Sequence, residues 1–173
     1  WDDGKIHIFP FSTQVGEYNP DPNINQGAFW IQRRVLEWAD YPKIKTVDQY
    51  FQLIEDFINA HPDEDLIGFT MLTDDWRFFA TTNIPNHLAG YPNDGEVMVD
   101  METYEARIYA GSEWDKRWWK TLNELNAKGL FDKASFTDNY DQYIAKLTSH
   151  KVLGMFDYGW QIGNAQNALT DAA

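Results

Sequence analysis

The sequence predicts an α/β fold, in which a mixed and mostly parallel sheet is flanked by helices. Segments with the period of strands alternate with segments with the period of helices along most of the chain. A chain of 173 residues is long enough for one domain with its own hydrophobic core. With 43% hydrophobic and 24% charged residues, its composition is that of a folded globular chain. No repeat or linker interrupts the pattern, so we expect one α/β unit over residues 1–173.

The first part of the chain predicts two strands separated by a long loop. Gly4–Phe11 alternates in polarity and is stopped by Pro10, as expected for a strand. Residues 12–27 are rich in Gly, Asn, Asp and Pro, which is typical of a loop. Ala28–Gln32 is the next expected strand, and it leads into a short helix over residues 33–40.

Residues 45–62 give the clearest helix signal in the chain. Thr46 and Gln49 have the T-x-x-Q spacing of a capping box, and Pro62 closes the segment. The apolar residues at helical spacing are Val47, Tyr50, Phe51, Ile54, Phe57 and Ile58.

A buried-type strand is expected at Leu66–Leu72. Thr73 or Asp74 is then placed to cap a helix. The side chains expected on this helix are Trp76, Phe79 and Ala80. Residues 88–109 read as a turn, a strand, a second turn and a short strand.

Two helices and a strand complete the pattern. Ser112 caps the first helix and Gly129 ends it. Its packing stripe is Trp114, Trp118, Leu122 and Leu125. The second helix is expected to carry Tyr140, Tyr143, Ile144 and Leu147 on one side. Val152–Tyr158 is the last strand, after which residues 159–172 begin another helix.

Charge and composition exclude several classes of function. A net charge of −13 repels nucleic acid and anionic lipid, so we expect no nucleic-acid partner. The absence of cysteine excludes disulfides and thiolate chemistry, and no two of the four histidines have the i, i+4 spacing of a zinc motif. No dinucleotide, phosphate-loop, metalloprotease or serine-hydrolase motif occurs. We therefore expect no cofactor, no metal and no catalytic residue.

The carboxyl ends of strands are where α/β sheets bind ligands. In this sequence they fall at Pro10–Gln14, Thr73–Trp76 and Tyr158–Gln161. Trp76 lies among charged residues, and Trp160 follows Tyr158 amid polar ones. A flat aromatic ring covers the apolar face of a sugar, while carboxylates, amides and guanidinium groups bind its hydroxyls.

Each of these residues also has a structural interpretation. Trp76 and Trp160 can equally be core anchors, because aromatic side chains are more often buried than exposed. Asp74 and Asp75 can be a helix cap and a solvated charge, or the acid of a glycosidase, whose second carboxylate the sequence does not place.

The order of segments resembles a known family, the carbohydrate-type (family 1) extracellular solute-binding proteins of bacterial ABC importers. The phrases that carry the resemblance are "GKIHIFP", "FWIQRRVLEW", "KTVDQYFQLIEDF", "IGFT", "WWKTLNELNAKGLFDKASFT" and "QYIAKLTSHKVLGMFDYGW". They cover nearly the whole chain. Two features depart from the family pattern: Arg34 and Val35 replace an Asp-x-Leu phrase, and the segment around Pro62 lacks a glycine-rich calcium loop.

The resemblance implies one lobe of a periplasmic-binding-protein type II fold, with a hinge strand near residues 4–11. It further implies that the first lobe of the same protein is missing from this sequence, which begins at Trp1 without a methionine. The expected partners are a saccharide ligand, that first lobe and an ABC permease in the membrane. The expected location is extracellular or periplasmic, with a lipid anchor on the full-length lipoprotein.

The same resemblance implies a ligand-binding role for residues at the three strand ends. Trp160 matches the family's stacking aromatic, and the segment with Trp76 matches one that supplies a carboxylate and an aromatic. The full set of expected ligand-binding residues is Trp160, Trp76, Tyr158, Asp74, Asp75, Gln14 and Gln161.

The leading hypothesis is therefore non-catalytic binding of an extracellular saccharide. A glycan-active enzyme is one alternative, and it predicts two carboxylates facing each other across a pocket. A protein-interaction module is the other, and it predicts a flat patch of exposed aromatics.

Overall fold

The computed structural model describes residues 27–91, 97–100 and 102–166. The expected strand at Gly4–Phe11, the following loop up to residue 26 and the candidate ligand residue Gln14 lie outside the described residues.

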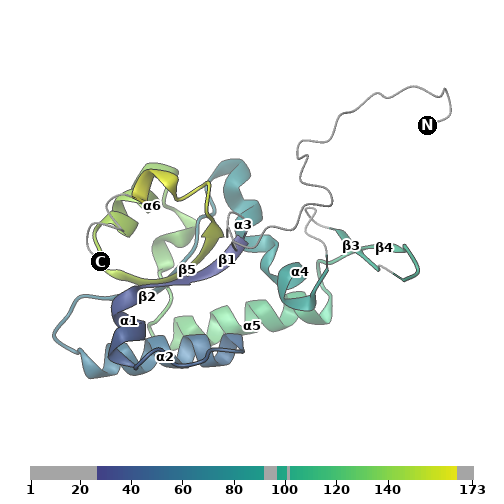
Figure 1. Ribbon diagram of the computed structural model, residues 1–173. Helices are drawn as coiled ribbons and strands as arrows, with labels where there is room; N and C mark the ends of the chain where they lie inside the picture. The colour runs from purple at the N-terminus through teal and green to yellow at the C-terminus, as the bar shows by residue number, and fades with distance from the viewer. Residues whose placement is uncertain (1–26, 92–96, 101, 167–173) are drawn as a thin grey trace, which may run out of the picture.

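A mixed sheet of three strands forms the centre of the fold (Figure 1). Its order is β1 (Gly27–Ile31), β5 (Val152–Tyr158), β2 (Ile67–Thr70). β2 runs parallel to β5, and β1 runs antiparallel to it. β5 is central and buried along its whole length, as its continuous apolar run predicts. The predicted α/β class with a mixed sheet is confirmed.

Helices cover both faces of this sheet. α2 (Val47–Ala60) and α5 (Glu113–Ala127) lie along one face and α6 (Tyr140–Thr148) along the other (Figure 1). The core on the first face includes Phe51, Ile54, Phe69, Trp118, Leu122 and Phe156. The core on the second face includes Leu72, Tyr143, Leu147, Met155, Ile162 and Ala165. The apolar stripes read from the sequence therefore face the sheet, except that the ring of Trp114 is exposed.

Local capping signals fix where these helices begin. Thr46 caps α2 by accepting the Gln49 backbone N–H at 3.2 Å. The Gln49 side chain bonds to the Lys45 N–H, so only half of the predicted capping box forms. Ser112 caps α5, which is followed by Gly129 in the left-handed region at φ +74°.

The segment after β2 differs from the single helix that the sequence predicts. It consists of a 3₁₀ turn, η1 (Asp75–Phe78), and two short helices, α3 (Phe79–Thr82) and α4 (Ile84–Ala89). The Asp74 side chain makes no cap hydrogen bond to η1. The Asp74 carboxylate instead accepts a hydrogen bond from the Tyr140 N–H. The turn is therefore left without the N-terminal cap that a longer helix needs.

The remaining elements lie around this body. α1 (Arg33–Trp38) follows β1, and η2 (Lys133–Phe136) follows α5. β3 (Val97–Val99) and β4 (Ala106–Ile108) form the predicted hairpin, an antiparallel pair that projects beside the start of α5 (Figure 1). In the part of the chain that the structure describes, no helix has the length and apolar character needed to cross a bilayer.

Close packing of α2 on β5 depends on Gly154. A Cβ at this position would come within 3 Å of both the Tyr50 hydroxyl and the Ile54 side chain. We expect Gly154→Ala to lower the free energy of unfolding by about 1–3 kcal/mol through overpacking. Urea unfolding measures this, with Gly163→Ala as the matched control because nothing lies within 4 Å of a Cβ there. Equal stability of the two variants would contradict the packing described here.

Candidate functional site

The carboxyl ends of β2 and β5 meet at one edge of the sheet because the two strands are parallel. β1 begins at the same edge, where Gly27 pairs with Tyr158. The segments that follow β2 and β5 therefore leave the sheet side by side. Two of the three places that the sequence marks for a ligand lie on these segments.

Trp76 and Trp160 come together at this edge. Their ring centroids are 6.0 Å apart and their planes differ by 3°. Phe79 adds a third ring, 6.0 Å from Trp76 and 6.2 Å from Trp160, with interplanar angles of 7° and 8°. We call these three side chains the aromatic platform. Parallel rings at this separation have the offset arrangement that aromatic pairs favour.

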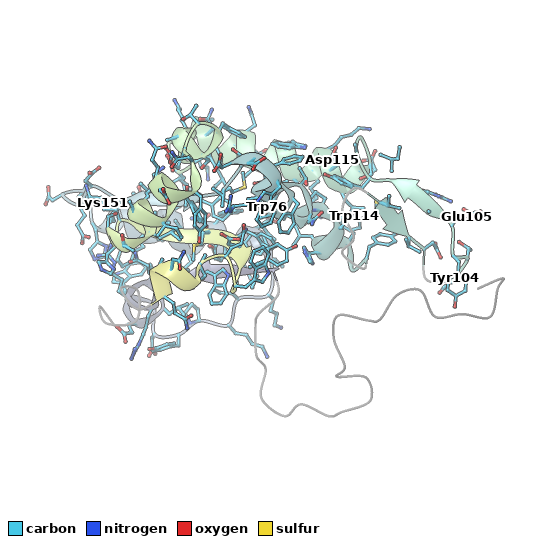
Figure 2. All side chains as sticks on the ribbon, turned by 90° about the horizontal axis from the view of Figure 1, so that it is seen from above. Trp76, Tyr104, Glu105, Trp114, Asp115 and Lys151 are labelled. Atoms are coloured by element: carbon cyan, nitrogen blue, oxygen red, sulfur yellow. The ribbon has the colours of Figure 1, made fainter. Side chains whose placement is uncertain are left out.

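Both indoles of the platform are open to solvent. Trp76 is 54% exposed and Trp160 is 48% exposed, so neither is a core anchor. In Figure 2 Trp76 lies on the main body of the molecule, away from Tyr104 and Glu105 at the tip of the hairpin. The exposed rings thus lie over the edge of the sheet where β2 and β5 end.

Tyr158 packs against the buried side of the aromatic platform. Its side chain is 2% exposed, so the predicted ligand-binding residue Tyr158 lies beneath the surface and not on it. The ring centroid lies 5.0 Å from that of Phe79 and 5.9 Å from that of Trp160. Its hydroxyl lies 3.1 Å from Nε2 of His87 on α4. The side chain of Tyr158, the last residue of β5, therefore points inward. The exposed ring is that of Trp160, in the turn that follows the strand.

A buried carboxylate fixes the turn that presents Trp160. Asp157 is fully buried and accepts three hydrogen bonds, from the Tyr143 hydroxyl at 2.8 Å, the Tyr158 N–H at 2.7 Å and Nε2 of Gln161 at 2.6 Å. Burial raises the pKa of Asp157, and the three donors counteract part of that rise. Residues on both sides of Trp160 are therefore tied to one carboxylate.

Gln161 belongs to this internal bracing. Its side chain is buried and donates to Asp157, so it is not on the exposed surface where a direct ligand contact was expected. Its backbone N–H donates to the Tyr158 carbonyl at 2.9 Å, which closes the turn. The position of Gln161 directly after Trp160 in the sequence is compatible both with ligand contact and with internal bracing, so the sequence does not distinguish the two roles.

The loop that carries Trp76 is fixed by bonds to α6 and η2. Oδ2 of Asp74 accepts the Tyr140 N–H, 2.9 Å away, at the start of α6. Thr73 donates its hydroxyl hydrogen to the Ser135 carbonyl at 2.6 Å. Asp75 is exposed and has a φ of +50°, a left-handed conformation that Asp tolerates better than most residues. Asp74 is therefore a structural link, while the Asp75 carboxylate faces solvent.

The geometry fits binding better than catalysis. Asp74 accepts a hydrogen bond from the backbone of α6, which is a structural role and not that of a catalytic acid. Among the described residues, no group of three His, Asp or Glu side chains is arranged to hold a metal ion. An exposed aromatic surface beside a free carboxylate can bind a ligand that is apolar on one face and hydroxylated at its rim.

Three residues near this surface were not singled out as ligand residues from the sequence. Phe79 was expected only as part of a helix, and His87 and Tyr140 lie on α4 and α6. Their sequence signals are those of ordinary helix faces. Only the pairing of β2 with β5 brings them to the same edge as Trp160.

The chain is similar in sequence and in fold to known proteins. No family model matches the chain. In sequence it is 28% identical over 158 residues to the fructooligosaccharide ABC transporter substrate-binding protein FusA of Streptococcus pneumoniae serotype 4. The alignment covers 83% of this chain and 27% of FusA, so the chain spans about a quarter of the length of this relative.

Solved structures show the same fold. FusA of S. pneumoniae in complex with kestose superimposes with a TM-score of 0.59 at 23% identity, over 78% of this chain and 28% of that one. Maltose-bound MalE3 of T. maritima gives a TM-score of 0.56 at 13% identity, over 78% and 32%. A Bacillus licheniformis sugar transporter protein in complex with stachyose gives 0.56 at 14%, over 85% and 38%.

The resemblance to solute-binding proteins is confirmed. The proteins named in these matches are substrate-binding or sugar transporter proteins, and two of the structures hold kestose or stachyose. The chain matches part of the fold of these solved structures, and the exposed Trp76 and Trp160 rings lie beyond the ends of β2 and β5.

The buried carboxylate of Asp157 gives a stability prediction. Asp157→Ala leaves the Tyr143 hydroxyl, the Tyr158 N–H and the Gln161 amide without their acceptor. We expect it to lower the free energy of unfolding by about 2–4 kcal/mol. Asp157→Asn keeps the shape and one acceptor oxygen and should lose less, as measured by urea unfolding. Equal losses in the two variants would show that the hydrogen bonds of Asp157 do not matter.

His87 gives a pH prediction. Burial lowers the pKa of His87, so the folded chain takes up this proton at a lower pH than the unfolded chain, where the pKa is about 6.5. The stability that neutral His87 contributes is therefore present above about pH 6.5 and is lost as the pH falls below it. Unfolding free energies at pH 7.5 and pH 5.5 should show a smaller fall for His87→Gln than for the parent. An unchanged fall in His87→Gln would contradict the prediction.

Proposed function

We propose that this chain forms one wall of the saccharide-binding site of an extracellular or periplasmic protein that delivers its ligand to an ABC importer. The single observation that carries the proposal is the exposed, parallel pair Trp76 and Trp160 at the carboxyl edge of the sheet. Large apolar patches of exposed aromatic rings usually mark a site where a ligand or a partner protein binds.

The surroundings of the aromatic platform favour a sugar over a purely apolar ligand. The Asp75 carboxylate beside it faces solvent. Within the described residues, no hydrogen bond occupies the indole N–H of Trp76 or Trp160. A sugar ring offers C–H groups to the ring faces and hydroxyls to these polar groups. The rings would bind the face of the sugar, and the polar groups its edge.

The wider assignment rests on the relatives. FusA is named as a fructooligosaccharide substrate-binding protein of an ABC transporter, and a quarter of its length aligns with this chain. We extend that role to this protein, with a second lobe closing over the ligand, a membrane permease as the partner and a lipid anchor on the complete protein. Residues 1–173 form a single α/β lobe in this proposal, with the hinge strand near residues 4–11 and Gln14 on the cleft side.

Calorimetry on the full-length product of the gene, with kestose, maltose and stachyose as probes, tests the proposal. We expect Trp160→Ala and Trp76→Ala each to weaken binding by about 1–3 kcal/mol, because each removes a stacking surface. Trp119→Ala is the matched control, since Trp119 is 42% exposed on α5 and lies outside the aromatic platform.

The outcomes separate the alternatives. Failure of the parent to bind any of the three sugars contradicts the proposal, as does an equal loss in the Trp119 control. Release of reducing ends from these oligosaccharides would instead indicate a glycan-active enzyme.

A further inference from the structure

We infer that Arg77 is a specificity-determining residue of this site, whose guanidinium donates hydrogen bonds to two neighbouring hydroxyl oxygens of a neutral sugar lying on the aromatic platform. The inference rests on the proposed function and adds a residue and a ligand chemistry to it.

Two aromatic rings hold the Arg77 guanidinium in place. Its Cζ lies 4.8 Å from the centroid of Trp76 and 4.4 Å from the centroid of Tyr140. Both distances are within the range of cation–π interactions. A planar guanidinium held against aromatic rings loses little freedom when it binds, so its donors are oriented in advance.

Tyr140 joins the two halves of the site and so fixes Arg77 relative to both. Its hydroxyl donates to the Gln161 carbonyl at 2.7 Å, in the turn that presents Trp160. Its backbone N–H donates to Asp74, in the loop that presents Trp76. Arg77 therefore lies beside the aromatic platform, against a ring that is bonded to both halves of the site.

The donors of Arg77 have no acceptor in the described part of the chain. Of the four other arginines there, three have ion pairs, Arg33 with Glu37, Arg34 with Glu64 and Arg107 with Glu105. No such ion pair or side-chain hydrogen bond occupies the guanidinium of Arg77 within the same residues. A guanidinium that is oriented but unpaired is available to a ligand.

The charges nearby decide which ligand oxygens fit. The guanidinium fork matches two adjacent acceptors, either vicinal hydroxyls or a carboxylate. Asp75 and Arg77 are the two sequence neighbours of Trp76. Asp75 is exposed, and the whole chain carries a net charge of −13. A carboxylated sugar would be repelled, whereas hydroxyls can accept from Arg77 and donate to Asp75.

The test uses calorimetry on the full-length gene product with kestose, maltose and stachyose. Arg77→Lys keeps the charge but loses the fork, and Arg77→Met keeps only an apolar stem. We expect both to weaken binding of the preferred sugar about tenfold or more, and tenfold is the size of one lost charge-assisted hydrogen bond. Arg33→Met, which removes an exposed guanidinium on α1, is the control and should not change binding.

Deoxy analogues of the preferred sugar separate contact from indirect disturbance of Trp76. In the parent, removing either of two adjacent hydroxyls should lower affinity, and in Arg77→Met that penalty should vanish. An additive penalty overturns the inference while leaving the proposed function intact. A parent that prefers uronic-acid oligosaccharides, with the preference lost in Arg77→Met, overturns the assignment of a neutral ligand. A parent that binds none of the sugars overturns the proposed function and the inference with it.

Discussion

The parallel pairing of β2 with β5 is the constraint on which the rest of the site depends. Ile67 pairs with Val152 and Thr70 with Met155, so both strands end at the same edge. Two residues 84 positions apart, Trp76 and Trp160, are thereby placed with their rings 6.0 Å apart. With an antiparallel pair, the following segments would leave from opposite edges and no common surface would form.

Exposed rings at such an edge need bracing, and the fold provides it with buried polar groups. Asp157 holds the turn under Trp160, and Asp74 links the loop with Trp76 to α6. A buried carboxylate costs free energy of solvation, and three donors only partly offset the cost. A well-packed apolar core would be as stable without this charge. The arrangement is therefore better explained by the need to fix exposed side chains than by stability alone.

The sequence predicts the elements of this fold better than it predicts the orientation of single side chains. The α5 helix follows from Ser112 and Gly129, and β5 from an apolar run, because caps and periodicity are local signals. Trp76 and Trp160 were identified for the same reason, since each lies in the segment that follows a strand. Tyr158 was expected to be exposed, but its burial depends on Phe79 and His87, which come from a distant part of the chain.

The absence of a single continuous helix after β2 has a similar explanation. Local spacing predicts that Asp74 caps a helix, but its carboxylate has a competing partner in the Tyr140 N–H, 66 residues away. Once that bond forms, the segment continues as a 3₁₀ turn and two short helices. Long-range hydrogen bonds of this kind override local propensity and have no signature in the sequence.

The shape of the aromatic platform also bears on how a ligand is retained. A sugar that lies against these nearly parallel rings has its other side in water. Binding sites for small molecules usually bury 70–90% or more of the ligand surface, and contact on one side does not reach that fraction. Tight binding therefore needs an opposing surface that closes over the platform. A rigid, braced wall suits this arrangement, because the closing surface then meets rings whose positions are already fixed and the ordering cost of binding is reduced.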